Sequence, residues 1–491
     1  MRKGGILLPV SSIPSKYGIG TFSRQAYEFV DFLEKAGQRY WQILPLGPTG
    51  YGDSPYQSFS TFAGNPYYID LESLIQEGWI TKEDCEACDF GSNDMYVDYE
   101  KIYKSRFQIL RKAYKKSKIA ENKTFQDFKK QNAYWLFDYA LYMAVKNSFK
   151  GASWIEWDED IKLRKPSAMK AYKEKYAAEV EFYEFQQFLF AKQWLALKEY
   201  ANERDIQIIG DIPIYVAFDS ADTWANPELF QLDDRCTPIG VAGCPPDAFS
   251  ATGQLWGNPL YEWEYHKKTD YEWWMRRITY CYELYDVVRI DHFRGFDEYY
   301  FIPYGNPTAE FGQWKKGPGY DIFRVMKARL GNKPVIAEDL GFLTPSVIKL
   351  VKKTGYPGMK ILQFAFDSRE ESDYLPHNYT SNAVVYTGTH DNDTITGWYT
   401  TFNRKDKAFA KRYLNIKTKK DIHWDFIRAA LASVADTAII PMQDYLGLGS
   451  EARINTPSTL GDNWKWRLTS GQLDDELAEK IRKMTKLYGR I

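Results

Sequence analysis

The stretch Val287-Val288-Arg289-Ile290-Asp291-His292 shows the pattern that decides the fold: a short β-branched run that ends in charged side chains. Similar apolar runs recur along the chain with helical patterns between them, which is typical of βαβ units in a parallel sheet. The predicted strands are Gly5–Val10, Tyr40–Leu46, Gln207–Pro213, Val287–Asp291, Pro334–Glu338, Lys360–Phe366, Ala383–Thr387 and Thr437–Met442. Eight strands alternating with helices predict an α/β protein whose sheet closes into a (β/α)8 TIM barrel.

The helix after the first strand has the clearest pattern. We expect it to start near Ser23, whose hydroxyl can cap it, and to stop at Gly37. Its apolar stripe consists of Tyr27, Val30, Phe32 and Leu33. Further helices are predicted over residues 271–285, 346–353 and 421–434.

Two segments are too long to be simple barrel loops. About 160 residues separate the second and third strands, far more than one connection needs, so a subdomain must be inserted there. Its residues, roughly 70–185, carry apolar side chains at helical spacing, and we expect it to be mostly helical. A Gly/Pro-rich segment, residues 220–262, has little regular pattern, and we expect it to form a loop or lid. We therefore expect one catalytic barrel, 1–491, with two insertions.

Composition narrows the choice of partners. Lys and Arg total 64 against 65 Asp and Glu, so no net charge would attract nucleic acid or an acidic membrane surface. No run approaches the length of a membrane span, and no signal peptide is evident, so a cytoplasmic location is expected. Five cysteines without zinc-ribbon spacing indicate free thiols. Aromatic residues reach 17%, and their flat rings suit stacking on uncharged ligands such as sugars.

Carboxylates stand at four of the predicted strand ends, the place where barrel enzymes carry their active sites. They are Asp211, Asp291, Glu338 and Asp391. Three carboxylates around one cleft suit glycosidic bond chemistry, with one ionised nucleophile, one protonated acid and a third that binds the sugar. No metal-ligand spacing accompanies them.

Sequence neighbours suggest which carboxylate has which role. Arg289 lies two residues before Asp291 on the same strand, so its side chain faces the same way and would keep Asp291 ionised as the nucleophile. Glu338 follows an apolar run and is the expected acid, because an apolar environment raises a carboxyl pKa. Asp391, with His390, would hydrogen-bond the sugar hydroxyls.

Several motifs together resemble a known family. They are Asp53-Ser54-Pro55-Tyr56, Gly210-Asp211-Ile212-Pro213, residues 289–295, Ala337-Glu338-Asp339-Leu340-Gly341 and Thr389-His390-Asp391-Asn392-Asp393-Thr394. In this order, and over nearly the whole chain, the sequence resembles the 4-α-glucanotransferases called amylomaltase or disproportionating enzyme, of glycoside hydrolase family 77 in the α-amylase superfamily. The resemblance implies a barrel with inserted subdomains and no separate C-terminal β-domain.

The resemblance also implies residue roles. Asp291 matches the nucleophile, Glu338 the acid/base and Asp391 the transition-state stabiliser. The implied sugar-binding residues at the cleavage point are Ser54, Tyr56, Asp211, Arg289 and His390. The segment 247–259 is similar to a flexible loop that covers the acceptor side, with Trp256 stacking on a glucose. Tyr51 matches a position linked to a second glucan site on the family's surface.

The implied reaction moves a segment of an α-1,4-glucan to the 4-hydroxyl of an acceptor glucan or glucose, with retention, through a covalent glucosyl-enzyme on Asp291. The substrates would be maltooligosaccharides or dextrins derived from starch or glycogen. No cofactor or metal is expected, since the five histidines show neither HxH nor HExxH spacing. The composition fits a monomer or a homodimer.

Two alternatives stay open at this point. An α-amylase-type hydrolase would use the same carboxylates and differ only in letting water attack the intermediate. A non-catalytic glucan-binding protein would use the aromatic residues for binding and the carboxylates only as hydrogen-bond partners. In that protein, Asp291→Asn would leave function intact.

Overall fold

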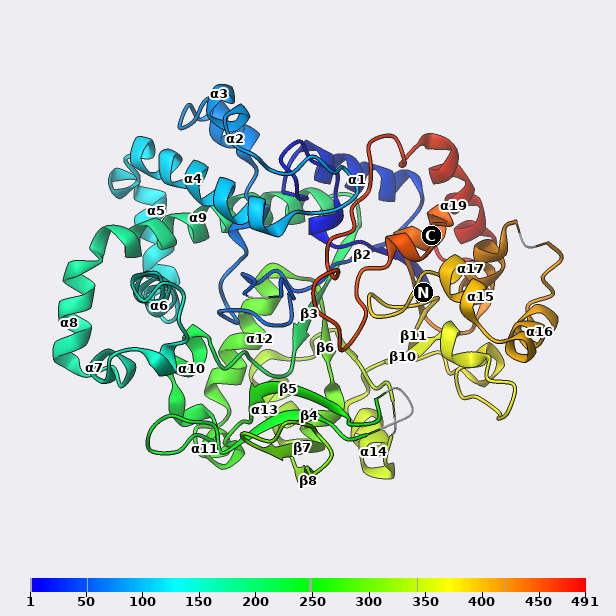
Figure 1. Ribbon diagram of the computed structural model, residues 1–491. Coiled ribbons are helices and arrows are strands. Elements are labelled where there is room, and N and C mark those ends of the chain that lie inside the picture. The colour runs from blue at the N-terminus through cyan, green and yellow to red at the C-terminus, as the bar shows by residue number, and fades with distance from the viewer. Residues whose placement is uncertain (1, 51, 247–249, 342, 419) are drawn as a thin grey trace.

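The computed structural model describes residues 2–50, 52–246, 250–341, 343–418 and 420–491. Within these ranges, eight parallel strands form a closed barrel at the centre of the molecule, which confirms the predicted TIM barrel (Figure 1). The barrel strands are β1 (Lys3–Leu7), β2 (Tyr40–Gln42), β3 (Gln207–Pro213), β6 (Val287–Asp291), β9 (Val335–Ala337), β10 (Gly358–Ile361), β11 (Ala383–Tyr386) and β12 (Thr437–Pro441). They follow one another around the barrel in chain order, so each is hydrogen-bonded to its sequence neighbours in the set.

Most of the predicted strands extend past the observed ends, and two of them extend four or five residues too far. The ladder of β2 ends at Gln42, and that of β10 ends at Ile361, after which Leu362–Ala365 form a 3-10 helix. Leu362 and Ala365 are nevertheless fully buried. An apolar run predicts burial but does not mark where backbone pairing stops, which explains the error.

Helices cover the outside of the barrel. They include α1 (Arg24–Lys35), α12 (Glu272–Leu284), α13 (Asp321–Leu330), α14 (Pro345–Thr354) and α17 (Ile422–Ala432). Of the predicted apolar stripe of α1, Val30, Phe32 and Leu33 are buried, whereas Tyr27 is only partly buried. Phe29, which the prediction did not include, is buried as well. The expected cap is wrong: the hydroxyl of Ser23 donates to the Gln25 side chain, 2.8 Å away, instead of accepting a bond from the first turn.

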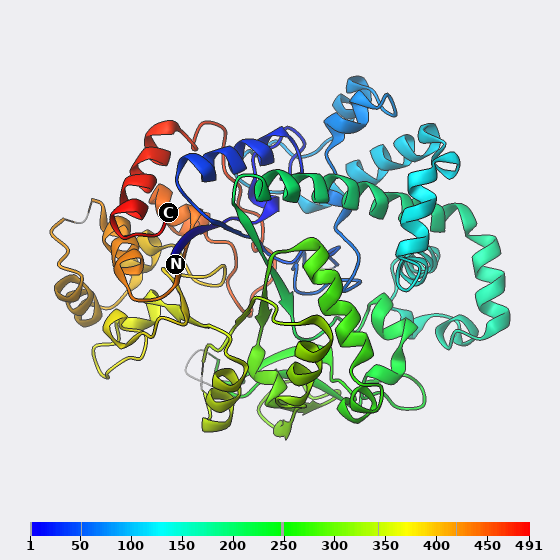
Figure 2. The same ribbon diagram turned by 180° about the vertical axis from the view of Figure 1, so that it is seen from behind.

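A helical lobe lies to one side of the barrel, formed by the connection between β2 and β3 (Figures 1 and 2). Its helices are α2 (Leu71–Gln76), α3 (Lys82–Glu86), α4 (Tyr99–Ser117), α5 (Lys123–Gln131), α6 (Leu136–Ser148), α7 (Glu159–Lys162), α8 (Pro166–Lys175) and the first half of α9 (Ala177–Asn202). Residue 185, where we expected the insert to end, lies inside α9, which continues to the barrel without interruption. The division of the chain into a barrel and two inserts stays a prediction.

A second sheet was not predicted. In the described residues, four antiparallel strands pair in the order β5-β4-β7-β8. They are β4 (Gly240–Cys244), β5 (Gln254–Pro259), β7 (Glu298–Pro303) and β8 (Gln313–Lys316). The expectation of little regular structure over 220–262 is therefore wrong for β4 and β5. Glycines interrupt the alternating apolar pattern that would identify a strand. They are required there, because a Cβ on Gly240 would lie 2.2 Å from the Phe301 ring, and one on Gly243 would lie 2.2 Å from the Gln254 carbonyl oxygen.

The remaining helices are α10 (Ala221–Ala225), α11 (Trp263–Lys268), α15 (Ile395–Thr401), α16 (Arg404–Tyr413), α18 (Met442–Leu446) and α19 (Asp475–Leu487). Residues 442–491 are helical or irregular and contain no strand. Near the chain ends, the Gly4 amide donates to the Arg490 carbonyl at 3.1 Å. A search of the described helices found none with the length and apolar character to cross a membrane.

Candidate active site

The register of the barrel brings four predicted site residues together at the ends of three adjacent strands. Asp211 of β3 pairs with Arg289 of β6, and Ile290 pairs with Ala337 of β9, so Asp291 and Glu338 follow at the same edge. Arg289 Nη1 lies 2.7 Å from both carboxylate oxygens of Asp211 and 3.0 Å from Asp291 Oδ1. Arg289 and Asp211 are only 3% and 1% exposed. One buried guanidinium therefore holds two carboxylates at the barrel mouth.

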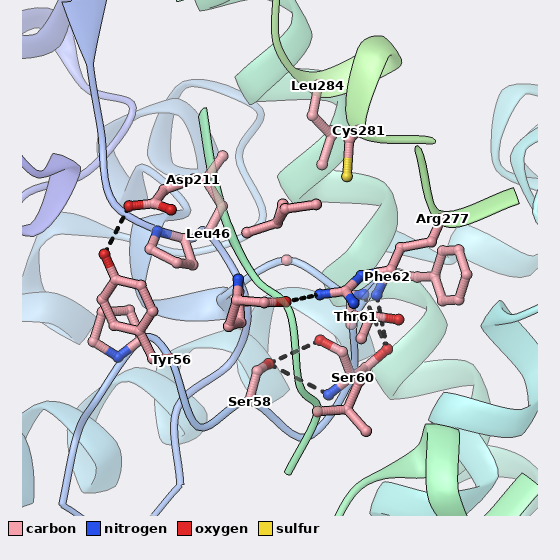
Figure 3. A pocket seen from close by; sticks show the side chains of 18 of the residues that line it. Leu46, Tyr56, Ser58, Ser60, Thr61, Phe62, Asp211, Arg277, Cys281 and Leu284 are labelled. Atoms are coloured by element: carbon pink, nitrogen blue, oxygen red, sulfur yellow. Dashed lines mark hydrogen bonds between the residues drawn. The ribbon is translucent and has the colours of Figure 1, made fainter. Parts of the chain in front are cut away.

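Tyr56 extends this cluster from the loop after β2. Its hydroxyl donates to Asp211 Oδ2 at 2.7 Å, as the dashed line in Figure 3 shows. Desolvation, reinforced by the negative charge of Asp211, holds the pKa of the Tyr56 phenol well above its ordinary value, so the group stays a donor. Its ring stacks on His390 with 5.0 Å between centroids. Ser54 contributes to the turn before it, where Ser54 Oγ accepts from the Tyr56 amide at 3.3 Å.

Glu338 is fixed by two backbone donors. The His292 amide donates to Oε2 at 2.7 Å, and the Leu340 amide donates to Oε1 at 2.9 Å. His292 adopts a left-handed conformation, with φ of 52°, which is a costly geometry for a non-glycine residue and is typical of functional sites. Desolvation raises the pKa of Glu338 to about 7, and the charge of Asp291 adds to the effect.

The pKa of Asp291 is also raised, but less far. Desolvation moves it to about 6, while the cation of Arg289 acts in the opposite direction. Arg289 therefore has the predicted effect on Asp291, but loss of hydration outweighs it. At pH 7 the pair still favours an ionised Asp291 beside a Glu338 that can hold a proton. These are the two protonation states that a retaining glycosidic reaction needs.

Asp391 lies in the loop after β11, next to His390. Its Oδ1 is 3.4 Å from His390 Nε2 and accepts a 2.6 Å hydrogen bond from the Asn455 amide. Arg453 donates to the Asp391 carbonyl oxygen at 2.7 Å. Trp464 completes the group, with its ring centroid 5.8 Å from that of Tyr56.

Sequence reasoning missed Arg453, Asn455 and Trp464. They lie in an irregular segment after the last barrel strand, and no periodic pattern marks them. The barrel topology could have indicated them. The segment after each barrel strand begins at the barrel mouth, and this holds for the eighth strand as for the others.

Trp256 lies on β5. Its ring meets His292 edge to face, with 4.8 Å between centroids, and also contacts Tyr215 at 6.2 Å. Because the His292 amide donates to Glu338, Trp256 lies one residue away from a carboxylate of the candidate site. The structure thus brings every predicted site residue to the barrel mouth except Tyr51, which lies outside the described residues, as do 247–249 of the expected acceptor loop.

Behind Tyr56 and Asp211 is a small cavity of about 50 Å³, lined by Ser58, Arg277 and Cys281 among others (Figure 3). A space of this size holds a few waters but no sugar ring. In the described part of the chain, no three His, Cys, Asp or Glu side chains lie close enough together to hold a metal ion.

Comparison with known proteins gives a consistent result. A family profile described as 4-alpha-glucanotransferase matches residues 8–473. The chain is 51% identical to a 4-alpha-glucanotransferase of Clostridium butyricum, covering 98% of this chain and 99% of the relative. It is 46% identical to the enzyme of that name from Thermus thermophilus, covering 100% and 99%. Its structure matches an amylomaltase from Streptococcus agalactiae, solved in complex with acarbose, with a TM-score of 0.97, 43% identity and full coverage of both chains.

Proposed function

The chain belongs to the 4-α-glucanotransferase family, and from this premise we propose that the enzyme works by a retaining double displacement on Asp291. The observation that carries the proposal is the placement of two carboxyl groups at one barrel mouth: Asp291 lies 3.0 Å from the Arg289 guanidinium, and Glu338 accepts hydrogen bonds from two backbone amides. Desolvation raises both pKa values, to about 6 for Asp291 and about 7 for Glu338, and Arg289 opposes the rise at Asp291, the group that must be ionised.

In the first half-reaction, Asp291 attacks the anomeric carbon of the donor while Glu338 protonates the leaving glycosidic oxygen. The bond between that carbon and oxygen breaks, and a β-linked glycosyl-enzyme forms. Arg289 stabilises the carboxylate before attack. Asp391 accepts hydrogen bonds from the sugar hydroxyls, and those bonds strengthen as positive charge develops on the ring.

In the second half-reaction, the 4-hydroxyl of an acceptor glucan or glucose gives its proton to Glu338 and attacks the same carbon. The ester bond to Asp291 breaks, and the α-1,4 linkage is restored. Water competes for this step at roughly 55 M, so transfer requires acceptor binding that places the 4-hydroxyl first. We assign this task to Trp256 and the segment 250–259, the described part of the loop expected to cover the acceptor side.

The donor would be an α-1,4-glucan bound across Tyr56, His390 and Asp211. Support comes from the stacked aromatic rings of Tyr56 and His390, which offer a flat surface to a sugar. The amylomaltase from Streptococcus agalactiae carries acarbose in its solved complex. For Ser54, a contact to the sugar follows from its place in the same turn as Tyr56.

A second glucan site at Tyr51 stays a prediction. Two residues further along the chain, Asp53 borders a surface groove of about 1010 Å³ that also contains Tyr96 and Tyr99. The groove is long enough for an oligosaccharide and offers aromatic and polar side chains. Substituting Tyr51 by Ala would lower binding of long glucans without changing turnover of maltotriose.

The test is incubation of the purified enzyme with maltotriose and no added metal or cofactor, with chromatography of all products. Glucose together with a ladder of longer maltodextrins, at constant reducing ends, is the expected result. Shortening with a rise in reducing ends would show an amylase-type hydrolase. No change in chain length would favour a glucan-binding protein, and activity of Asp291→Asn would remove the covalent mechanism.

A further inference from the structure

The antiparallel sheet beside the barrel has a small apolar cluster of its own. Val241 of β4 pairs with Ile302 of β7, so their side chains share one face, and Tyr300 lies on that face two residues before Ile302. Together with Ala309 they form a hydrophobic cluster that is separate from the main core. Ala309 belongs to the loop 304–312, which joins β7 to β8 and covers this face.

A single hydroxyl fastens this covering loop at two points. Tyr300 Oη donates to the Ala309 carbonyl oxygen at 3.0 Å and accepts from the Gly312 amide at 3.1 Å. Tyr300 is 4% exposed and Ala309 is fully buried, so water does not compete for these bonds. The hydroxyl therefore fixes the loop 304–312 against the sheet.

The loop in turn holds the tight turn 250–253, which precedes β5. The Ala309 amide donates to the Thr252 carbonyl oxygen at 3.1 Å. Gly253 has a φ of +72°, and a Cβ there would lie 2.8 Å from the Ala309 Cβ, so the Gly253 backbone packs closely against the Ala309 side chain. Within the turn, Ser250 Oγ donates to the Gly253 carbonyl oxygen at 2.6 Å.

This turn leads directly into the strand that carries Trp256. The Trp256 ring nitrogen donates to the Gln254 side chain at 3.1 Å, and the ring then meets His292. A continuous series of contacts therefore runs from Tyr300 through Ala309 and the turn to the wall of the active site. Tyr300 itself touches none of the catalytic groups.

We propose that Tyr300 is a positioning residue for the acceptor: its hydroxyl fixes the loop 304–312, which fixes the turn 250–253 and with it the orientation of Trp256. The proposal rests on the proposed function, in which Trp256 holds the acceptor. Loss of the hydroxyl then affects the second half-reaction, where acceptor and water compete. Formation of the glycosyl-enzyme depends on the barrel carboxylates and is unaffected.

The test compares Tyr300→Phe with Tyr304→Phe. Both remove one hydroxyl from the same region, but Tyr304 is 53% exposed, which makes it a matched control. The burst of fluoride from α-maltotriosyl fluoride measures glycosyl-enzyme formation, and product chromatography with glucose as acceptor measures the ratio of transfer to hydrolysis. Tyr300→Phe removes two hydrogen bonds, but their loss reaches the acceptor only through the turn 250–253. We therefore expect this ratio to fall about fivefold and the KM for glucose to rise by about the same factor, which is the net size of one hydrogen bond. The burst rate stays within twofold.

A wild-type ratio and a wild-type KM for glucose in Tyr300→Phe would overturn the proposal, even if the melting temperature fell, because the hydroxyl would then only stabilise the fold. An equal change in Tyr304→Phe would overturn it as well. Should Tyr300→Phe not fold, Ala309→Gly removes the contact to Gly253, and the same change in ratio is expected. Absence of burst and ladder in the wild-type enzyme would instead refute the proposed function.

Discussion

The two walls of the active site are built differently. On the wall that we propose binds the donor (the donor side), Asp211, Arg289 and Tyr56 are joined by direct side-chain bonds of 2.7 Å and are anchored on barrel strands or the loop beside them. On the wall that we propose binds the acceptor (the acceptor side), Trp256 is half-buried on a separate four-stranded sheet of the described chain, and it is held through the backbone of a neighbouring turn. Charge stabilisation requires fixed groups, whereas a wall that binds acceptors of varied length must let them enter and leave.

The largest loss of activity should come from substituting the proposed nucleophile, Asp291, on the donor side. Asp291→Asn keeps the shape of the side chain but cannot form the ester, so we expect kcat on maltotriose to fall by at least about 1,000-fold with the fold intact. Asp205→Asn, at an 88% exposed side chain before β3, is the control. A variant that keeps more than a tenth of the wild-type rate would remove Asp291 from its assigned role.

Asn455→Ala tests whether activity depends on the residues that orient the carboxylates of the site. It removes the 2.6 Å hydrogen bond to Asp391, and we expect kcat to fall about 30-fold while the KM for maltotriose changes little, since bonds to charged groups are strong. Asn382→Ala, which removes an exposed amide bond to Gly355, should be neutral. An unchanged kcat would show that Asp391 is oriented without Asn455.

Trp256→Ala tests the acceptor wall. Loss of the stacking surface should lower the ratio of transfer to hydrolysis about tenfold and leave fluoride release from maltotriosyl fluoride nearly unchanged. Phe311→Ala, at a 79% exposed ring, provides the comparison. Equal losses in donor cleavage and in transfer would show that the two walls are not separable as described.

The smallest effect is the pH dependence of the wild-type enzyme. Activity requires Asp291 ionised, so kcat/KM should rise as pH passes about 6, and it requires Glu338 protonated, so it should fall as pH passes about 7. The profile is therefore a narrow bell in weakly acidic solution, measured by initial rates with maltotriose. A plateau extending well above pH 8 would contradict the role of Glu338.

The two walls also differ in how much of each could be predicted from the sequence. β3 and β6 were predicted to the residue, because each is a β-branched run with a charged side chain at or near its end. Their ends locate Asp211, Arg289 and Asp291, so the donor side followed from the pattern. The acceptor side could not be predicted from the pattern. Its strands depend on close contacts at Gly240 and Gly243, and glycine adds no side chain to an alternating apolar pattern.

The supporting residues were missed for a different reason. Asn455 and Arg453 act through single hydrogen bonds from an irregular segment, and such bonds depend on tertiary position and leave no periodicity. Trp256 could be located only through the resemblance of its segment to a family loop. Side chains at the ends of neighbouring strands can be placed once the strands are predicted from the sequence. Hydrogen bonds between irregular loops cannot be placed in this way.

The helix α9 has a mechanical consequence. Its 26 residues form one rod of about 39 Å whose first half lies in the helical lobe and whose last turn ends four residues before β3. One uninterrupted helix therefore connects the lobe to the strand that bears Asp211, with only residues 203–206 between helix and strand. We expect a displacement of the lobe to be transmitted along this helix to the barrel.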